Sequence, residues 1–241
     1  MDSLIANRTK SSKLSKVDFY HLEFGKYTTD HMAVAKYSQG KWGEMEILPF
    51  ENLSLSPTIL ALHYGQSVFE GLKAHRKKNG DIAFFRLDKH LERLNKSLER
   101  MVMPSLPAKL FNDSIIELVK RDKDWVPPID AAGASLYIRP FVFATETRFG
   151  VKVSDEYLYI VFCGPVGPYY SKDLKVRVET KFVRAAEGGP GYAKCSGNYG
   201  GAFLPTHLAR KDGFDQVLWT DAKHHKYIEE SGTMSVFFVI D

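Results

Sequence analysis

The chain has 241 residues, of which 44% are hydrophobic and 26% charged, as in ordinary globular proteins of one or two domains. Its net charge is only +4, it has no basic stripe with interleaved aromatic residues, and no apolar run approaches membrane-spanning length, so nucleic acid and membrane are not expected partners. Two cysteines, Cys163 and Cys195, are too few for a disulfide framework and indicate a reducing compartment, for which cytoplasm is the default.

The first two thirds of the chain alternate strand and helix patterns. Residues 1–16 are polar and predict a tail. A hairpin is predicted over 71–87, because Asn79-Gly80 is a strong turn signal. A helix is predicted over 88–101, with Asp88 or a neighbour as its cap. The other predicted elements are strands at 31–37, 43–50, 134–146 and 156–164, a short buried helix over 59–69, and a helix at roughly 108–122.

A Gly- and Pro-rich stretch at 164–173 predicts a linker between domains 1–163 and 174–241, in an α+β protein. Beyond it, we expect a strand over 174–185, a glycine-rich loop, and a helix closed by Gly213. A strand over 214–221 and a bent strand pair over 227–241 follow, with 235–241 reading as a buried strand. About 68 residues are marginal for an independent core, so we expect the second domain to be truncated.

The glycine-rich loop over 187–203, EGGPGYAKCSGNYGGAF, is the stretch most typical of a functional site. Dense glycine is costly to order, and it allows backbone to turn sharply or to approach a ligand closely. A desolvated lysine in such a loop has a lowered pKa and can form a Schiff base with an aldehyde. Lys194 lies in the middle of the loop, with Tyr199 five residues later.

The cofactor pyridoxal 5'-phosphate (PLP) needs an amine for its aldehyde, a carboxylate for its ring nitrogen, a donor for its phenolic oxygen and a cation for its phosphate. The sequence offers candidates for each of these groups. Lys194, Tyr199 and Arg86 are candidates for the amine, the phenolic-oxygen donor and the phosphate cation. Spacing alone leaves either Glu229 or Glu230 as the carboxylate. A zinc site at His224 and His225 is disfavoured, because adjacent residues of a strand point to opposite sides.

The chain resembles the branched-chain amino acid aminotransferases, PLP enzymes of fold type IV, in stretches that run in order across nearly its whole length. The resemblance implies an α/β sandwich small domain followed by a pseudo-barrel large domain that is incomplete here. The matching stretches are FGKYTTDHM (24–32), HYGQSVFEGLKAHR (63–76), FFRLDKHLERLNKS (84–97), LYIRPF (136–141), GPVGPYY (164–170), GGPGYAKCSGNYGGAF (188–203) and EESGTMSVFF (229–238).

The resemblance also implies a role for each candidate residue. Lys194 would bond the cofactor aldehyde and move a proton at the substrate Cα, and Tyr199 would bond the ring's phenolic oxygen. Glu230, rather than Glu229, would pair with the ring nitrogen. Arg86 would hold the phosphate, and Thr233 would line the cofactor or substrate side of its turn.

An apolar pocket for a branched side chain is implied as well, walled by Phe24, Tyr64, Phe69, Tyr137 and Tyr169. Arg139 would lie beside it and would either orient Tyr64 or receive the second carboxylate of glutamate. Burying each methylene there is worth roughly 0.8 kcal/mol.

The implied reaction is transamination of L-leucine, L-isoleucine or L-valine with 2-oxoglutarate, giving branched-chain 2-oxo acids and glutamate, in a homodimer whose 149–151 loop and Tyr64 reach toward the other subunit. Alternatives are a D-amino acid aminotransferase, an aminodeoxychorismate lyase, or a non-catalytic truncated PLP-binding chain. Ser235 replaces the asparagine usual in the family. Because we expect a truncated second domain, we also expect weak PLP binding or poor turnover.

Overall fold

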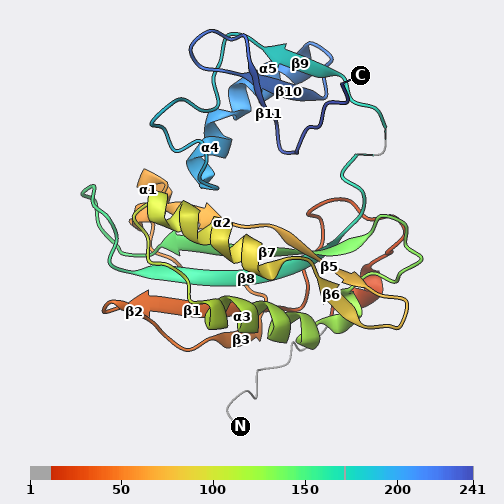
Figure 1. Ribbon diagram of the computed structural model, residues 1–241. Helices are drawn as coiled ribbons and strands as arrows, with labels where there is room; N and C mark the ends of the chain where they lie inside the picture. The colour runs from red at the N-terminus through yellow and green to blue at the C-terminus, as the bar shows by residue number, and fades with distance from the viewer. Residues whose placement is uncertain (1–11, 171, 241) are drawn as a thin grey trace. The chain divides into compact units, whose positions relative to one another are not determined.

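The computed structural model describes residues 12–170 and 172–240 (Figure 1). The chain forms two compact units, Met1–Tyr169 and Tyr170–Asp241. Most of the predicted tail lies outside the described residues, but Leu14–Lys16 form a short 3-10 helix, η1.

An eight-stranded sheet organises the first unit, and every strand pair in it is antiparallel. The strands follow the order β2-β1-β8-β7-β5-β6, with β3 paired to β1 and β4 paired to β7. Their bounds are β1 His31–Ser38, β2 Lys41–Trp42, β3 Glu46–Pro49, β4 Ser67–Phe69, β5 Leu72–Arg76, β6 Ile82–Phe84, β7 Ser135–Ala144 and β8 Tyr157–Val166. The hairpin predicted around Asn79-Gly80 is confirmed by the pairing of β5 with β6.

The two long helices of this unit agree with the predicted ranges within one residue. Helix α2 spans Leu87–Arg100, and α3 spans Ala108–Arg121 before the 3-10 helix η2 at Lys123–Trp125. Helix α3 contacts β1 and β8, while α2 contacts α3 and β4. The apolar side chains that recur at helical spacing form the buried faces of the two helices. They are Leu94, Leu98, Phe111, Ile115 and Leu118.

Three local features of this unit differ from expectation. The helix expected over 59–69 forms as α1 but spans only Leu60–Tyr64, with only Leu60 buried, because Gly65 adopts a left-handed backbone with φ 68° and the chain then enters β4. Asp88 does not occupy the N-cap of α2; that position belongs to Arg86, which makes no side-chain capping bond among the described residues. Strand β8 also continues to Val166, into the stretch predicted as linker.

The second unit contains a three-stranded sheet in the order β11-β10-β9. Strand β9 (Val176–Glu179) is parallel to β10 (Gln216–Thr220), and the helices α4 (Ser196–Gly201) and α5 (Phe203–Lys211) lie between them in sequence. Strand β11 (Ile228–Ser231) pairs antiparallel with β10. Ala209, Val217 and Trp219 form a small buried core there.

The end of the described chain differs from its prediction. Residues 235–240 form no regular strand, although a buried strand was expected. Phe237 is 90% exposed and Val239 is 95% exposed. The apolar run at 236–240 is thus not covered by any of the described residues.

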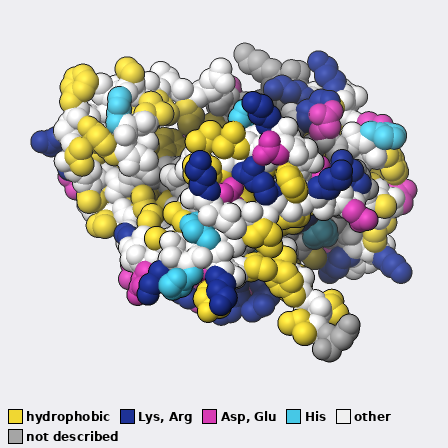
Figure 2. Space-filling model, turned by 90° about the horizontal axis from the view of Figure 1, so that it is seen from above, with side chains coloured by type: hydrophobic (Ala, Val, Ile, Leu, Met, Phe, Trp, Pro, Cys, Tyr) yellow, Lys and Arg dark blue, Asp and Glu magenta, His cyan; other side chains and the backbone are white. Residues whose placement is uncertain are grey.

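On the face shown in Figure 2, Lys and Arg side chains lie among acidic and apolar ones. Across residues 12–170 and 172–240, no helix is both long and apolar enough to cross a membrane.

Candidate active site

Lys194 lies where the glycine-rich loop meets α4. Its neighbours Ala193 and Cys195 are each 3% exposed, which fixes the backbone on both sides of the lysine. Asn198 donates from Nδ2 to the carbonyls of Pro190 (2.9 Å) and Ala193 (2.8 Å), so the first turn of α4 braces the loop.

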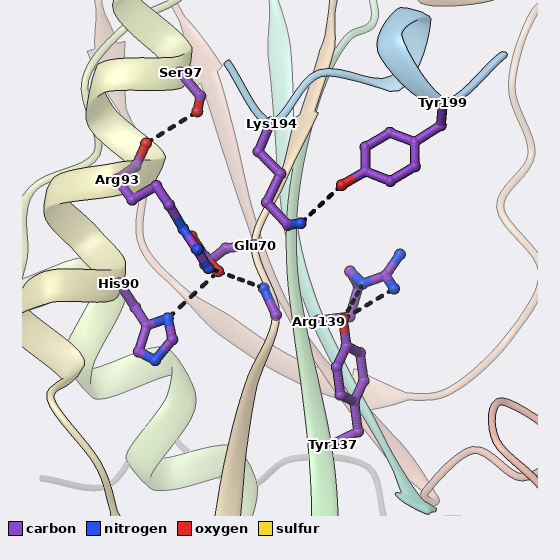
Figure 3. Close-up of polar contacts among 9 residues, drawn as sticks. Glu70, His90, Arg93, Ser97, Tyr137, Arg139, Lys194 and Tyr199 are labelled. Carbon is purple, nitrogen blue, oxygen red and sulfur yellow. Dashed lines mark hydrogen bonds and ion pairs between the residues drawn. The ribbon is translucent and has the colours of Figure 1, made fainter. Parts of the chain in front are cut away.

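The amine of Lys194 and the phenol of Tyr199 meet directly. Tyr199 lies on α4, and Lys194 Nζ donates to its hydroxyl oxygen over 2.8 Å (Figure 3). Both side chains are partly buried. A nucleophilic amine and a hydroxyl therefore share one site with restricted access to water.

Glu230 on β11 supplies a half-buried carboxylate in the same unit. Burial raises the pKa of Glu230, while the positive charges of Arg184 and Lys194 oppose that rise. Arg184 Nη2 lies 2.6 Å from Glu230 Oε2 and also donates to the carbonyl of Gly191 over 3.0 Å. Arg184 therefore connects the carboxylate to the loop that carries Lys194. Glu229 is exposed, and strand alternation turns it away.

Thr233 follows Glu230 in a strained turn. Its φ of 62° is rare for a β-branched residue, and such strain is concentrated at functional positions. Gln216 on β10 donates to the Thr233 hydroxyl over 3.0 Å. Gly232 permits this approach, because a Cβ there would overlap Gln216 Oε1.

Within the first unit, predicted pocket residues form an aromatic cluster. The Phe24 ring packs edge-on against Tyr137 and Tyr169, with centroids 5.3 and 4.9 Å apart. The Arg139 guanidinium lies 4.5 Å from the centroid of Phe69 and donates to the Tyr137 hydroxyl over 3.0 Å (Figure 3).

Two predicted residues have different surroundings from those expected. Tyr64 is not oriented by Arg139; its hydroxyl donates to the backbone carbonyl of Phe149. Arg86 is not at a strand end, because β6 stops at Phe84. Arg86 instead occupies the N-cap position of α2, where it is exposed and has a φ of 54°.

A buried acidic side chain, Glu70, lies next in sequence to Phe69 of the aromatic cluster. Glu70 is fully buried and accepts hydrogen bonds from Arg93, His90 and the Gly71 amide (Figure 3). Burial opposes ionisation, but these hydrogen bonds prevail and lower the pKa of Glu70 to about 2. At Gly71, a Cβ would overlap the hydroxyl of Tyr137, so only glycine leaves that ring in place.

Sequence reasoning missed Arg184, Gln216 and Glu70. Glutamine inside the otherwise apolar FDQVLW strand was a usable signal, because a buried polar side chain needs partners. Arg184 and Glu70 lie in stretches whose pattern does not single them out.

His225 belongs to the histidine pair at which a zinc site was disfavoured. In the structure it makes a hydrogen bond with the Thr220 hydroxyl over 3.1 Å.

The sequence matches the family described as Amino-transferase class IV over residues 67–241. It is 45% identical to "Branched-chain-amino-acid transaminase 1" of Bacillus subtilis over all of this chain and 68% of that protein. It is 44% identical to "Branched-chain-amino-acid aminotransferase 2" of the same organism, over 96% of this chain and 64% of that one. The chain thus spans about two thirds of these relatives.

Solved structures show the same fold. A branched-chain aminotransferase from Thermoproteus uzoniensis with norvaline matches 83% of this chain and 63% of its own, with a TM-score of 0.66 and 21% identity. A T.th. branched-chain amino acid aminotransferase complexed with N-(5'-phosphopyridoxyl)-L-glutamate matches 83% of this chain and 61% of its own, with a TM-score of 0.62 and 25% identity. The predicted mixed α and β fold of type IV is confirmed, with less than two thirds of these structures covered.

Proposed function

Because the chain belongs to the class IV aminotransferases, and within them to the branched-chain amino acid group, we propose that it carries the PLP site of a branched-chain-amino-acid transaminase. The proposed reaction transfers the amino group of L-leucine, L-isoleucine or L-valine to 2-oxoglutarate, giving branched-chain 2-oxo acids and glutamate. The observation that carries the proposal is the 2.8 Å contact between Lys194 Nζ and Tyr199 Oη, with Glu230 in the same compact unit.

The donor set of the second unit fits PLP, the cofactor of this family. Lys194 would hold the aldehyde carbon, Tyr199 the phenolic oxygen and Glu230 the ring nitrogen. Thr233 would line the cofactor or substrate side of its turn, and Arg86 of the first unit would hold the phosphate. When bound, PLP supplies an aldehyde and an electron-accepting ring.

Proton movement falls to the chain's own residues. Lys194 would move a proton between the substrate Cα and the C4′ carbon of the cofactor, acting as general base and then as general acid. Tyr199 accepts a hydrogen bond from that amine, and so holds it in position between transfers. Arg184 keeps Glu230 oriented by a charge-assisted bond of 2.6 Å.

Substrate selection would fall to the aromatic cluster of the first unit. Phe24, Phe69, Tyr137 and Tyr169 offer apolar area to a branched side chain. Arg139 is partly buried between Phe69 and Tyr137, and is a candidate to receive the second carboxylate of glutamate. In the proposed reaction 2-oxoglutarate accepts the amino group and becomes glutamate. The T.th. relative was solved in complex with N-(5'-phosphopyridoxyl)-L-glutamate, which is consistent with this role.

A homodimer is part of the proposal. Phe149 and Val151 are 85% and 78% exposed, and Tyr64 is tied to their loop through the Phe149 carbonyl. Large exposed apolar side chains gathered on one loop fit a surface that a second copy covers. Sedimentation of the purified chain tests this; a monomer at micromolar concentration contradicts it.

The decisive experiment locates the amine. The purified chain is mixed with PLP, reduced with borohydride and digested, and mass spectrometry should place the pyridoxyl adduct on Lys194. The control variant Lys194→Met should carry no adduct there. An adduct confined to other lysines, or none, contradicts the proposal.

Substrate class is tested on the same preparation. The chain loaded with PLP should transfer the amino group of L-leucine to 2-oxoglutarate, at a low rate, and should not use D-leucine. Preference for the D-enantiomer would favour the D-amino acid aminotransferase alternative. An adduct at Lys194 without turnover of any amino acid would identify a cofactor-binding chain that is not catalytic.

A further inference from the structure

Gln216 makes a set of hydrogen bonds that fixes which way its amide points. It is 4% exposed, at the start of β10. Its Oε1 accepts the amide proton of Val217 over 3.2 Å, which requires an oxygen at that position. Nε2 is therefore the donor to the Tyr170 hydroxyl and to the Thr233 hydroxyl, each over 3.0 Å.

This orientation determines the polarity of Thr233. A hydroxyl has one hydrogen and two lone pairs, and one lone pair of Thr233 is taken by Gln216. The hydroxyl hydrogen cannot point back at the Gln216 NH₂ group, so it points elsewhere. Thr233 is exposed and three residues after Glu230, on the turn with a φ of 62°. The result is a donor presented outward from the turn that follows the site carboxylate.

We propose that Gln216 is a positioning residue that makes Thr233 a dedicated hydrogen-bond donor to an oxyanion of the bound cofactor or substrate. The inference rests on the proposed function, since it assigns the ligand of that same site. The oxyanion is either the phosphate of PLP or the carboxylate of the amino acid and 2-oxo acid. Glycine at 232 belongs to the device, because a side chain there would push Gln216 away from Thr233.

The test is a double-mutant cycle on ligand affinity, with Gln216→Met, Thr233→Val and the double variant. Methionine and valine keep the volume but remove the donor and the hydroxyl. Each single variant should weaken binding of the oxyanion ligand about tenfold, the expected loss of one bond to a charged group. The double variant should be no weaker than Thr233→Val, because Gln216 acts only through Thr233. Thr233→Ser keeps the hydroxyl, so it should bind the oxyanion ligand with an affinity much closer to that of the wild type than Thr233→Val does.

Two ligand pairs distinguish the sources of the oxyanion. If the phosphate is bound, Gln216→Met weakens PLP and leaves pyridoxal, which lacks the phosphate, unaffected in fluorescence titrations. If the carboxylate is bound, PLP affinity is unchanged, and the variant weakens binding of 4-methyl-2-oxopentanoate to the pyridoxamine-phosphate-loaded chain. Additive losses in the cycle, or no loss for either ligand, overturn the inference.

A matched control separates positioning from general packing. Gln66 in the first unit is also buried, donates from Nε2 to Met101 O and the Tyr157 hydroxyl, and accepts the Ser154 amide proton. Gln66→Met should lower the melting temperature about as much as Gln216→Met but leave both affinities unchanged. If the two variants behave alike, Gln216 is structural only. If wild-type chain binds neither PLP nor pyridoxal, the proposed function fails instead.

Discussion

Replacing Arg184 with glutamine should weaken PLP binding and move its pH dependence upward. The guanidinium lies 2.6 Å from Glu230 and also donates to the Gly191 carbonyl of the lysine-bearing loop. Glutamine removes the positive charge and shortens the side chain, so both contacts are lost. Arg184→Lys keeps the charge but cannot span both partners, and serves as the matched control.

The size of the effect follows from distance and exposure. Two unit charges about 4 Å apart at an effective dielectric constant of about 20 attract by about 4 kcal/mol. The Glu230 side chain is 41% exposed, however, so solvent screening reduces the net value to roughly 1–2 kcal/mol. That corresponds to about a tenfold rise in the dissociation constant of PLP.

The direction of the pH dependence can be worked out separately. Burial raises the pKa of Glu230, and the Arg184 charge opposes that rise. Without Arg184 the pKa of Glu230 rises further, so at a given pH less of it is ionised to pair with the ring nitrogen. The loss of affinity should therefore be largest at low pH and smallest at high pH.

Fluorescence titration of PLP into wild type, Arg184→Gln and Arg184→Lys at several pH values measures both effects. Arg184→Lys should lie between the other two. If Arg184→Gln binds PLP with wild-type affinity and the same pH midpoint, the reasoning about the Arg184–Glu230 pair is refuted.

Three further predictions concern stability and the pocket. The pKa of Glu70 is about 2 against a usual 4.5, so its ion pair stabilises the fold above pH 4.5 and is lost as pH falls toward 2; urea unfolding at each pH should show this loss in wild type and not in Glu70→Gln. Gly71→Ala should displace Tyr137 and raise the KM for leucine several-fold with less effect on kcat, and unchanged KM would contradict the role given to that glycine. Trp219 is buried, so Trp219→Ala should destabilise the smaller unit by about 3–5 kcal/mol. Val239 is exposed, so Val239→Ala should change the stability by under about 0.5 kcal/mol. Equal urea midpoints for the two variants would contradict this prediction.

Local pattern was sufficient for much of the fold. Helices α2 and α3 were predictable because Leu94, Leu98, Ile115 and Leu118 recur at helical spacing, and the hairpin of β5 and β6 because Asn79-Gly80 favours a tight turn. The glycine-rich loop around Lys194 was recognisable as a site because its composition is too costly for a mere connection. The sequence pattern misled at 235–240, where a continuous apolar run predicted a buried strand and the side chains are exposed.

The sequence by itself therefore determined which residue types the site contains, because an amine, a phenol and a carboxylate at such positions match the needs of one cofactor. Only the tertiary structure decided how they are held. Arg184 meets Glu230, and Gln216 meets Thr233, across gaps of 46 and 17 positions that no local periodicity encodes. Such pairings depend on the register of β10 against β11 and on the path of the loop between β9 and α4. Register is set by packing of the whole sheet, which is why these partners could not be identified from the order of the residues.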